Sequence, residues 1–101
     1  MITSIKPNST EMVLWNGNHI GHHSAIADHV FFTSQVVLSG HCTVESYSFF
    51  GINSTIRDAV TIAEGSLVAM SASVTRSTEA WGFYKGYPAK KADKRSDEIY
   101  F

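Results

Sequence analysis

Five histidines lie in the N-terminal part of this 101-residue chain, at His19, His22, His23, His29 and His41. Histidine gains and loses a proton near neutral pH more readily than other side chains, so these residues are candidates for a general base. The adjacent pair His22-His23 is the most informative, because a base is usually held in place by a neighbouring group. This chemistry would remove a proton from an attacking hydroxyl or amine.

The element that must position these residues is set by a repeat of six. Counting in sixes from residue 14 gives a column of large apolar residues without a gap: Leu14, Ile20, Ile26, Phe32, Leu38, Val44, Phe50, Ile56, Ile62, Val68 and Val74. A period of six fits neither a helix nor a flat strand. Two places before each of them stand Met12, Asn18, Ser24, Val30, Val36, Cys42, Ser48, Ser54, Val60, Ser66 and Ala72, which are small or of valine size from Ser24 onward.

One large and one small inward residue per hexad predicts a narrow three-sided core with three hexads per coil. We therefore expect an all-β fold, a left-handed parallel β-helix of about three to four coils. A single domain would span 1–101, with the repeat over 12–75 and a C-terminal tail over 76–101. Within the tail, 81–88 is expected to form a last turn and strand, and 90–98 a short helix or a frayed end.

The spacing of three hexads places chosen residues on top of one another. His22 follows the inward Ile20 by two positions, which puts it outward at a corner, and Gly40 lies beneath it with Asp58 below. A glycine there leaves room for a reacting group and exposes a backbone N–H that can stabilise an oxyanion. The alternative is that His22 is only a solvent-exposed corner residue and Gly40 only permits a positive φ. His23 stacks over His41 by the same rule, and the alternative for this pair is two solvated corner histidines without a role.

The chain resembles the hexapeptide-repeat acyltransferases, especially the sugar O- and N-acetyltransferases of the sialic-acid O-acetyltransferase type. The resemblance covers about residues 14 to 91, and rests on the repeat and on three segments: 21–26 (GHHSAI), 49–58 (FFGINSTIRD) and 86–90 (GYPAK). It implies acetyl transfer from acetyl-CoA to a sugar hydroxyl or amine. It also implies that His22 is the general base, that Gly40 assists the oxyanion, and that His23 orients His22 or contacts the acceptor.

The resemblance further implies a coenzyme site. The residues that would contact CoA are Gly40, Ala69, Ser71, Gly86, Pro88, Ala89 and Lys90. The last four belong to the segment that resembles the family's C-terminal motif against acetyl-CoA. Lys90 and Lys91 would meet the CoA phosphates, unless this basic cluster is simply solvated. Trp81 would cover the open end of the core, or else stack on adenine.

The same resemblance implies a homotrimer with sites between subunits and a sugar or nucleotide-sugar acceptor. Two features depart from the family pattern. Only a short segment precedes His22, where family members usually carry a nucleotide-sugar-binding half, and His23 stands where Asp or Glu often follows the catalytic histidine. One alternative is therefore a non-catalytic or truncated trimeric module. A second is a metalloprotein like the γ-class carbonic anhydrases, which share this fold and bind zinc with histidines of adjacent subunits. We expect no metal.

Composition excludes several classes. The formal charge is −1, so no basic field points to nucleic acid. No apolar run approaches the roughly 18 residues of a membrane span, and the first residues lack the apolar core of a signal peptide. The single cysteine, Cys42, falls in the small inward column and is expected to be a buried hydrophobe. Arg57 and Asp58 are candidates for an ion pair between subunits, with a structural or a catalytic role left open, and a cytoplasmic location is the default.

Overall fold

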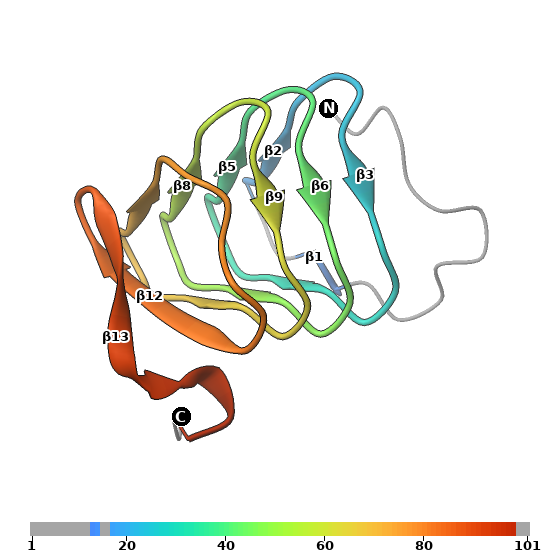
Figure 1. The fold of residues 1–101 in the computed structure, drawn as a ribbon. Coiled ribbons are helices and arrows are strands. Elements are labelled where there is room, and N and C mark those ends of the chain that lie inside the picture. Colours follow the sequence, from blue (N-terminus) through green and yellow to red (C-terminus); the bar gives the residue numbers. More distant parts are fainter. Residues whose placement is uncertain (1–12, 15–16, 99–101) are drawn as a thin grey trace.

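The computed structural model describes residues 13–14 and 17–98. The chain winds as a three-sided solenoid in which two-residue strands alternate with corners (Figure 1). Each strand of the repeat up to residue 56 pairs in parallel with the strand three hexads further on. This arrangement confirms the predicted fold class, a left-handed parallel β-helix. Met12 of the predicted register lies outside the described residues.

Three sheets form the sides of the prism, and we refer to them as sheets A, B and C. Sheet A has the order β1-β4-β7-β10-β12-β13, with bounds Val13–Leu14, Phe31–Phe32, Phe49–Phe50, Leu67–Val68, Gly82–Gly86 and Ala89–Arg95. Sheet B contains β2, β5, β8 and β11, with bounds His19–Ile20, Val37–Leu38, Thr55–Ile56 and Ser73–Val74. Sheet C contains β3, β6 and β9, with bounds Ala25–Ile26, Thr43–Val44 and Thr61–Ile62.

The core is the predicted pair of inward columns. The large column is buried from Ile20 to Val74, and Phe32 stacks on Phe50 with ring centroids 4.6 Å apart. The small column includes buried serines whose hydroxyls donate to backbone carbonyls, for example Ser54 to Gly51 at 2.9 Å. These bonds satisfy polar groups that would otherwise be costly inside the core. Burial of the columns gives the solenoid its stability.

A sharp turn at every corner depends on one residue in the left-handed region. These residues are His23, His29, Gln35, His41, Tyr47, Asn53, Ala59, Gly65 and Ser71. From the second coil onward, the N–H of such a residue donates to a carbonyl of the coil before it, as from His41 to His22 at 2.8 Å and from Ala59 to Gly40 at 3.0 Å. Because these bonds repeat coil by coil, the outward side chains of a corner form a column along the prism.

The C-terminal segment differs from the prediction. Residues 89–95 form β13, an antiparallel partner of β12, and only Ser96–Glu98 form a short 3-10 helix, η1. The expectation of a helix or a frayed end over 90–98 is therefore wrong for most of this segment. The physical reason is that β12 pairs with β10 and leaves an unpaired edge, which the returning chain satisfies.

Two aromatic residues close this end of the solenoid. Tyr84 is buried, and its hydroxyl accepts a hydrogen bond from the Glu79 N–H at 2.7 Å. Trp81 instead lies on Gly65, so close that a Cβ atom on Gly65 would overlap the indole ring. Trp81 thus covers a corner, and Tyr84 takes the capping position that was predicted for Trp81. Among the described residues, no helix is long and apolar enough to cross a membrane.

Candidate functional site

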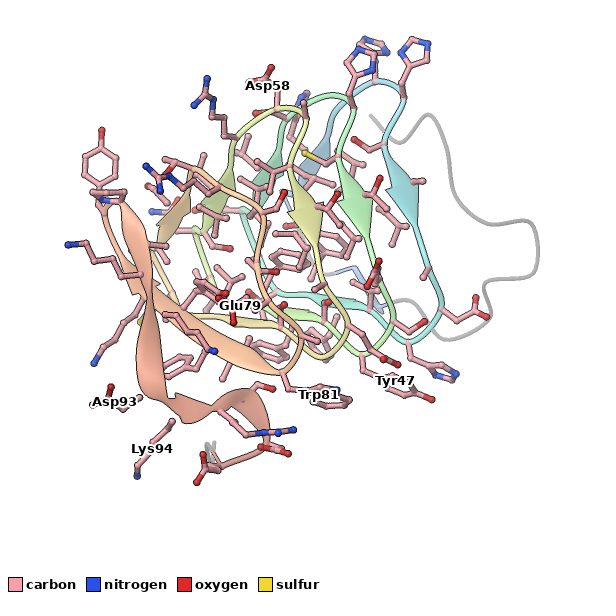
Figure 2. All side chains as sticks on the ribbon, in the orientation of Figure 1. Tyr47, Asp58, Glu79, Trp81, Asp93 and Lys94 are labelled. Atoms are coloured by element: carbon pink, nitrogen blue, oxygen red, sulfur yellow. The ribbon has the colours of Figure 1, made fainter. Side chains whose placement is uncertain are left out.

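The predicted catalytic residues lie together at one corner, between sheets B and C. We call it the histidine corner, and it consists of residues 22–23, 40–41 and 58–59. His22, His23 and His41 are exposed there, and Asp58 continues the same corner on the next coil (Figure 2). The structure therefore brings His22, His23 and Gly40 together, as their spacing predicted.

Gly40 lies directly against the backbone of His22. A Cβ atom on Gly40 would stand 3.1 Å from the carbonyl oxygen of His22. Gly40 does not have a positive φ, since the left-handed residue of this coil is His41. The alternative explanation, that glycine is needed for a positive φ, is therefore wrong, and close approach to the coil above explains the glycine better.

The N–H of Gly40 has no hydrogen-bond partner among the described residues. The first residue of other corners, such as Asp58, shares this property, so the free N–H comes from the corner geometry. Gly40 differs because it carries no side chain and stands under His22. Half-buried Gly40, whose N–H has no partner among the described residues, lies beside an exposed imidazole, and an N–H donor and a base are the groups that acyl transfer needs.

His23 stacks on His41 as the spacing predicted. The ring centroids are 5.0 Å apart and the planes differ by 3°, whereas His22 and His23 are 6.4 Å apart and tilted by 51°. Lone pairs of imidazole lie in the ring plane, so two parallel rings cannot both direct a nitrogen at one ion about 2.1 Å away. The described residues contain no group of three or more His, Cys, Asp or Glu suited to a metal ion. This arrangement within one chain does not fit a zinc site.

Two further residues near this corner have structural explanations. Arg57 Nε lies 3.7 Å from a carboxylate oxygen of Asp58 in the same chain, and both side chains are largely exposed. Their ion pair therefore forms within one chain. Cys42 is buried, and its thiol donates to the Arg57 carbonyl at 3.1 Å. Burial raises the pKa of the Cys42 thiol, so the neutral thiol is favoured over the thiolate. Because the thiolate is the nucleophilic form, Cys42 is better explained as a structural side chain.

The candidate coenzyme residues lie elsewhere on the prism. Ala69 and Ser71 lie at or beside the third corner, which consists of residues 34–35, 52–53 and 70–71 and joins sheets A and B. An apolar hollow of about 310 Å³ opens beside it, lined by Phe49, Ile52, Leu67, Ala69, Met70 and Phe83 among others. Ala69 thus lines a recess, whereas Ser71 is exposed in the left-handed corner position.

The other four coenzyme candidates form the tip of the terminal hairpin. Gly86 pairs with Ala89 across the turn, and Gly86 has a φ of 99°, which favours glycine. Pro88 and Lys90 are exposed. Lys91 pairs with Glu79 at 3.0 Å and Arg95 with Asp97 at 3.2 Å, so part of the basic cluster is neutralised. Lys90 has no ion pair among the described residues.

A single chain does not bring the two sets of candidates together. His22 and Gly40 lie at the histidine corner, in the N-terminal coils of the solenoid (Figure 1). Ala69 lies beside the third corner, and the hairpin forms the C-terminal end of the solenoid. Gly40, predicted for both roles, belongs to the histidine corner alone. A site that uses both sets therefore requires a second copy of the chain.

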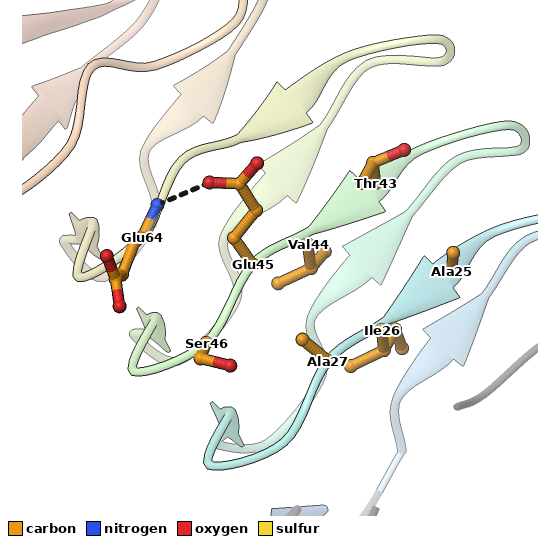
Figure 3. Close-up of a pocket in the computed structure, with 8 residues that line it drawn as sticks. All are labelled: Ala25, Ile26, Ala27, Thr43, Val44, Glu45, Ser46 and Glu64. Atoms are coloured by element: carbon orange, nitrogen blue, oxygen red, sulfur yellow. Dashed lines mark hydrogen bonds between the residues drawn. The ribbon is translucent and has the colours of Figure 1, made fainter. Parts of the chain in front are cut away.

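A hollow of about 470 Å³ contains none of the predicted residues. It lies on sheet C and is lined by small side chains together with Glu45 and Glu64 (Figure 3). A carboxylate oxygen of Glu45 accepts a hydrogen bond from the Glu64 N–H at 3.0 Å. The Glu45 carboxylate therefore helps to hold two coils together.

A column of outward apolar residues, all aromatic except Leu67, was not predicted. Phe31, Phe49, Leu67 and Phe83 lie in register on the outer face of sheet A. At the corner of residues 28–29, 46–47 and 64–65, which we call the aromatic corner, His29 stacks on Tyr47 at 5.0 Å. The spacing of three hexads contains this signal, since positions 29 and 31 recur as 47 and 49 with ring side chains at each.

Comparison with solved structures places the fold in a class. The chain superposes on serine acetyltransferase from Neisseria gonorrhoeae with a TM-score of 0.78 and 18% identity, over 91% of this chain and 41% of that one. It also superposes on AntD, an N-acyltransferase from Bacillus cereus crystallised with dTDP and coenzyme A, with a TM-score of 0.66 and 16% identity, over 92% and 77%. The chain therefore has the β-helix fold of the hexapeptide-repeat acyltransferases.

One curated relative carries the name of a different activity. Over 82 residues the chain is 37% identical to gamma carbonic anhydrase 1, mitochondrial, of Arabidopsis thaliana, and the match covers 76% of this chain and 28% of that protein. No family model matches the chain. The chain thus spans little more than a quarter of this relative and about two fifths of the serine acetyltransferase.

Proposed function

We propose that this chain is an acyltransferase that moves an acetyl group from acetyl-CoA to a sugar hydroxyl or amine. The observation that carries the proposal is the pairing of His22 with Gly40, an exposed imidazole above a glycine whose N–H is free among the described residues. The fold shared with acyltransferases, one of them crystallised with coenzyme A, supports it. The acceptor is proposed to be a sugar or nucleotide sugar, and the location cytoplasmic.

In the proposed reaction His22 takes the proton of the acceptor as its oxygen or nitrogen attacks the thioester carbonyl. The Gly40 N–H donates to the oxyanion of the tetrahedral intermediate. Collapse of this intermediate breaks the carbon–sulfur bond and releases CoA, which receives the proton from His22. The reaction balances without a covalent enzyme intermediate.

A homotrimer would complete the site, because the two sets of candidates lie on different corners of one chain. Each interface of a cyclic trimer joins two different surfaces of the chain, so the third corner of one copy faces another surface of the next copy. Ala69, Ser71 and the hairpin of one copy would hold the CoA arm beside His22 of its neighbour. Sedimentation that gives a monomer with full activity would contradict this arrangement.

Calorimetry with acetyl-CoA, followed by an acetyl-transfer assay over a panel of amino and hydroxy sugars, tests the proposal. We expect saturable binding of acetyl-CoA and of CoA and turnover on at least one acceptor. Binding without turnover on any acceptor would favour a non-catalytic module. No heat at millimolar acetyl-CoA would overturn the proposal.

A second candidate is a metalloprotein of the γ-carbonic-anhydrase type, which the 37% identity over 82 residues favours. The parallel rings of His23 and His41 do not fit two zinc ligands from one chain, so the zinc of this candidate would take histidines from adjacent subunits. Elemental analysis of protein purified without chelator distinguishes the candidates. Stoichiometric zinc together with hydration of carbon dioxide would establish the second candidate.

A further inference from the structure

We infer that His41 is a positioning residue that holds the His22-His23 pair in the geometry required for proton transfer at His22. This inference rests on the proposed function. It assigns to His41 and His23 together the orienting task that an acidic residue after the base would otherwise perform. The evidence is that His41 contacts both members of the pair through different groups.

The first contact fixes the backbone of the base. The N–H of His41 donates to the carbonyl oxygen of His22 at 2.8 Å, across the gap between two coils. Because the left-handed conformation of His41 directs this N–H toward the preceding coil, the bond is part of the corner. It places the peptide of His22 above Gly40.

The second contact fixes the neighbouring ring. The imidazole of His41 stacks on that of His23 with centroids 5.0 Å apart and planes 3° from parallel. An exposed side chain on a corner otherwise samples several rotamers, and ordering it costs conformational free energy. The stack limits the rotamers of His23, whose ring centroid is 6.4 Å from that of His22. His22 is thereby flanked by an ordered ring.

The chain itself offers a matched control. At the aromatic corner, His29 and Tyr47 stack with the same centroid distance of 5.0 Å and planes 1° from parallel. This second stack lies on a different edge of the prism from His22. If stacking only stabilises corners, loss of either stack should have the same effect on the protein.

The variants are His41→Ala, His41→Phe and Tyr47→Ala. His41→Ala removes the ring but keeps the backbone N–H, and Ala59 already occupies the equivalent position of the next coil with a φ of 58°. Alanine is therefore compatible with this corner. His41→Phe restores a flat ring that can stack but carries no nitrogen.

We expect His41→Ala to lower kcat for acetyl transfer about 10- to 100-fold, since small misplacements of a catalytic group have effects of this size. The KM for acetyl-CoA should stay within about twofold, because the other coenzyme candidates lie at the third corner and the hairpin. His41→Phe should recover most of the lost kcat, and Tyr47→Ala should leave kcat unchanged. In NMR spectra, the ring protons of His23 should shift in His41→Ala and much less in His41→Phe.

Wild-type kcat in a folded His41→Ala protein would overturn the inference while the proposed function stands. An equal loss in Tyr47→Ala would overturn it as well, because the stacks would then act only on stability. Failure of His41→Phe to recover activity would show that His41 does not position His22 through ring stacking. Absence of acetyl transfer in the wild-type protein would instead remove the proposed function and this inference with it.

Discussion

The α-carbon of Gly40 lies so close to His22 that a methyl group on it would stand 3.1 Å from the His22 carbonyl oxygen. This contact joins two successive coils and places a residue without a side chain under an exposed imidazole. The N–H of Gly40, which has no partner among the described residues, lies at the same corner as the candidate base. The histidine corner therefore combines a candidate base with a candidate oxyanion donor from the adjacent coil.

Replacement of the candidate base should abolish turnover without loss of coenzyme binding. We expect His22→Ala to lower kcat by about 10²- to 10⁴-fold, the range typical for removal of a general base. Affinity for CoA, measured by calorimetry, should change little. His19→Ala is the control, because His19 is exposed on the outer face of β2. Turnover that survives in His22→Ala would exclude this base.

Glycine should be required at position 21 for stability and at position 40 for catalysis. A Cβ atom on Gly21 would lie 2.5 Å from the backbone nitrogen of Gly40, and this backbone cannot move aside locally. We expect Gly21→Ala to cost about 1–3 kcal/mol, and Gly40→Ala less. Urea unfolding measures both values. In the acetyl-transfer assay, Gly40→Ala should lower kcat although the protein stays folded. Equal stability of Gly21→Ala and the wild type would contradict the packing argument.

Two neighbouring phenylalanines should differ sharply in their contribution to stability. Phe50 is fully buried and stacked on Phe32, whereas Phe49 points outward from the same strand and is half-buried. We expect Phe50→Ala to cost about 3–5 kcal/mol, because it leaves a cavity in the core. Phe49→Ala should cost less than half as much. Chemical unfolding of both variants, at one protein concentration, gives the comparison, and similar values would contradict the inward register.

Cys42 should be unreactive in the folded protein. Burial raises the pKa of its thiol above the ordinary value of 9.0, so the neutral thiol is favoured. The contribution of this group to stability is then fully present below about pH 9 and is lost as the pH rises through the raised value. Alkylation by iodoacetamide should be much slower in the native protein than in urea. Equal rates would show that the side chain is accessible.

Much of the fold could be predicted because a period of six residues is compatible with one fold, the three-sided β-helix. The inward residues Ile20, Leu38 and Ile56 recur at every third hexad, and the observed strand register is the same. The stack of His23 on His41 and the place of Gly40 under His22 follow from this arithmetic alone. Interactions within the repeat depend on neighbours at a constant distance along the chain.

The end of the solenoid could not be predicted in this way. From Thr75 onward the period is lost, and the buried position of Tyr84 depends on the edge that β10 leaves for β12. The same edge draws residues 89–95 into a strand, although their polar sequence resembles an exposed tail. Edge pairing of this kind depends on the assembled sheet, so a local pattern does not contain it.

The sequence by itself determined the coil length, the inward columns and the placement of His22 above Gly40, because each follows from counting in sixes. Only the tertiary structure decided three further points. The backbone of Gly40 has no positive φ, the rings of His23 and His41 are parallel, and residues 89–95 pair with β12 as a strand. Dihedral angles, ring planes and the pairing of a sheet edge depend on how coils stack in space, and residue spacing alone does not specify them.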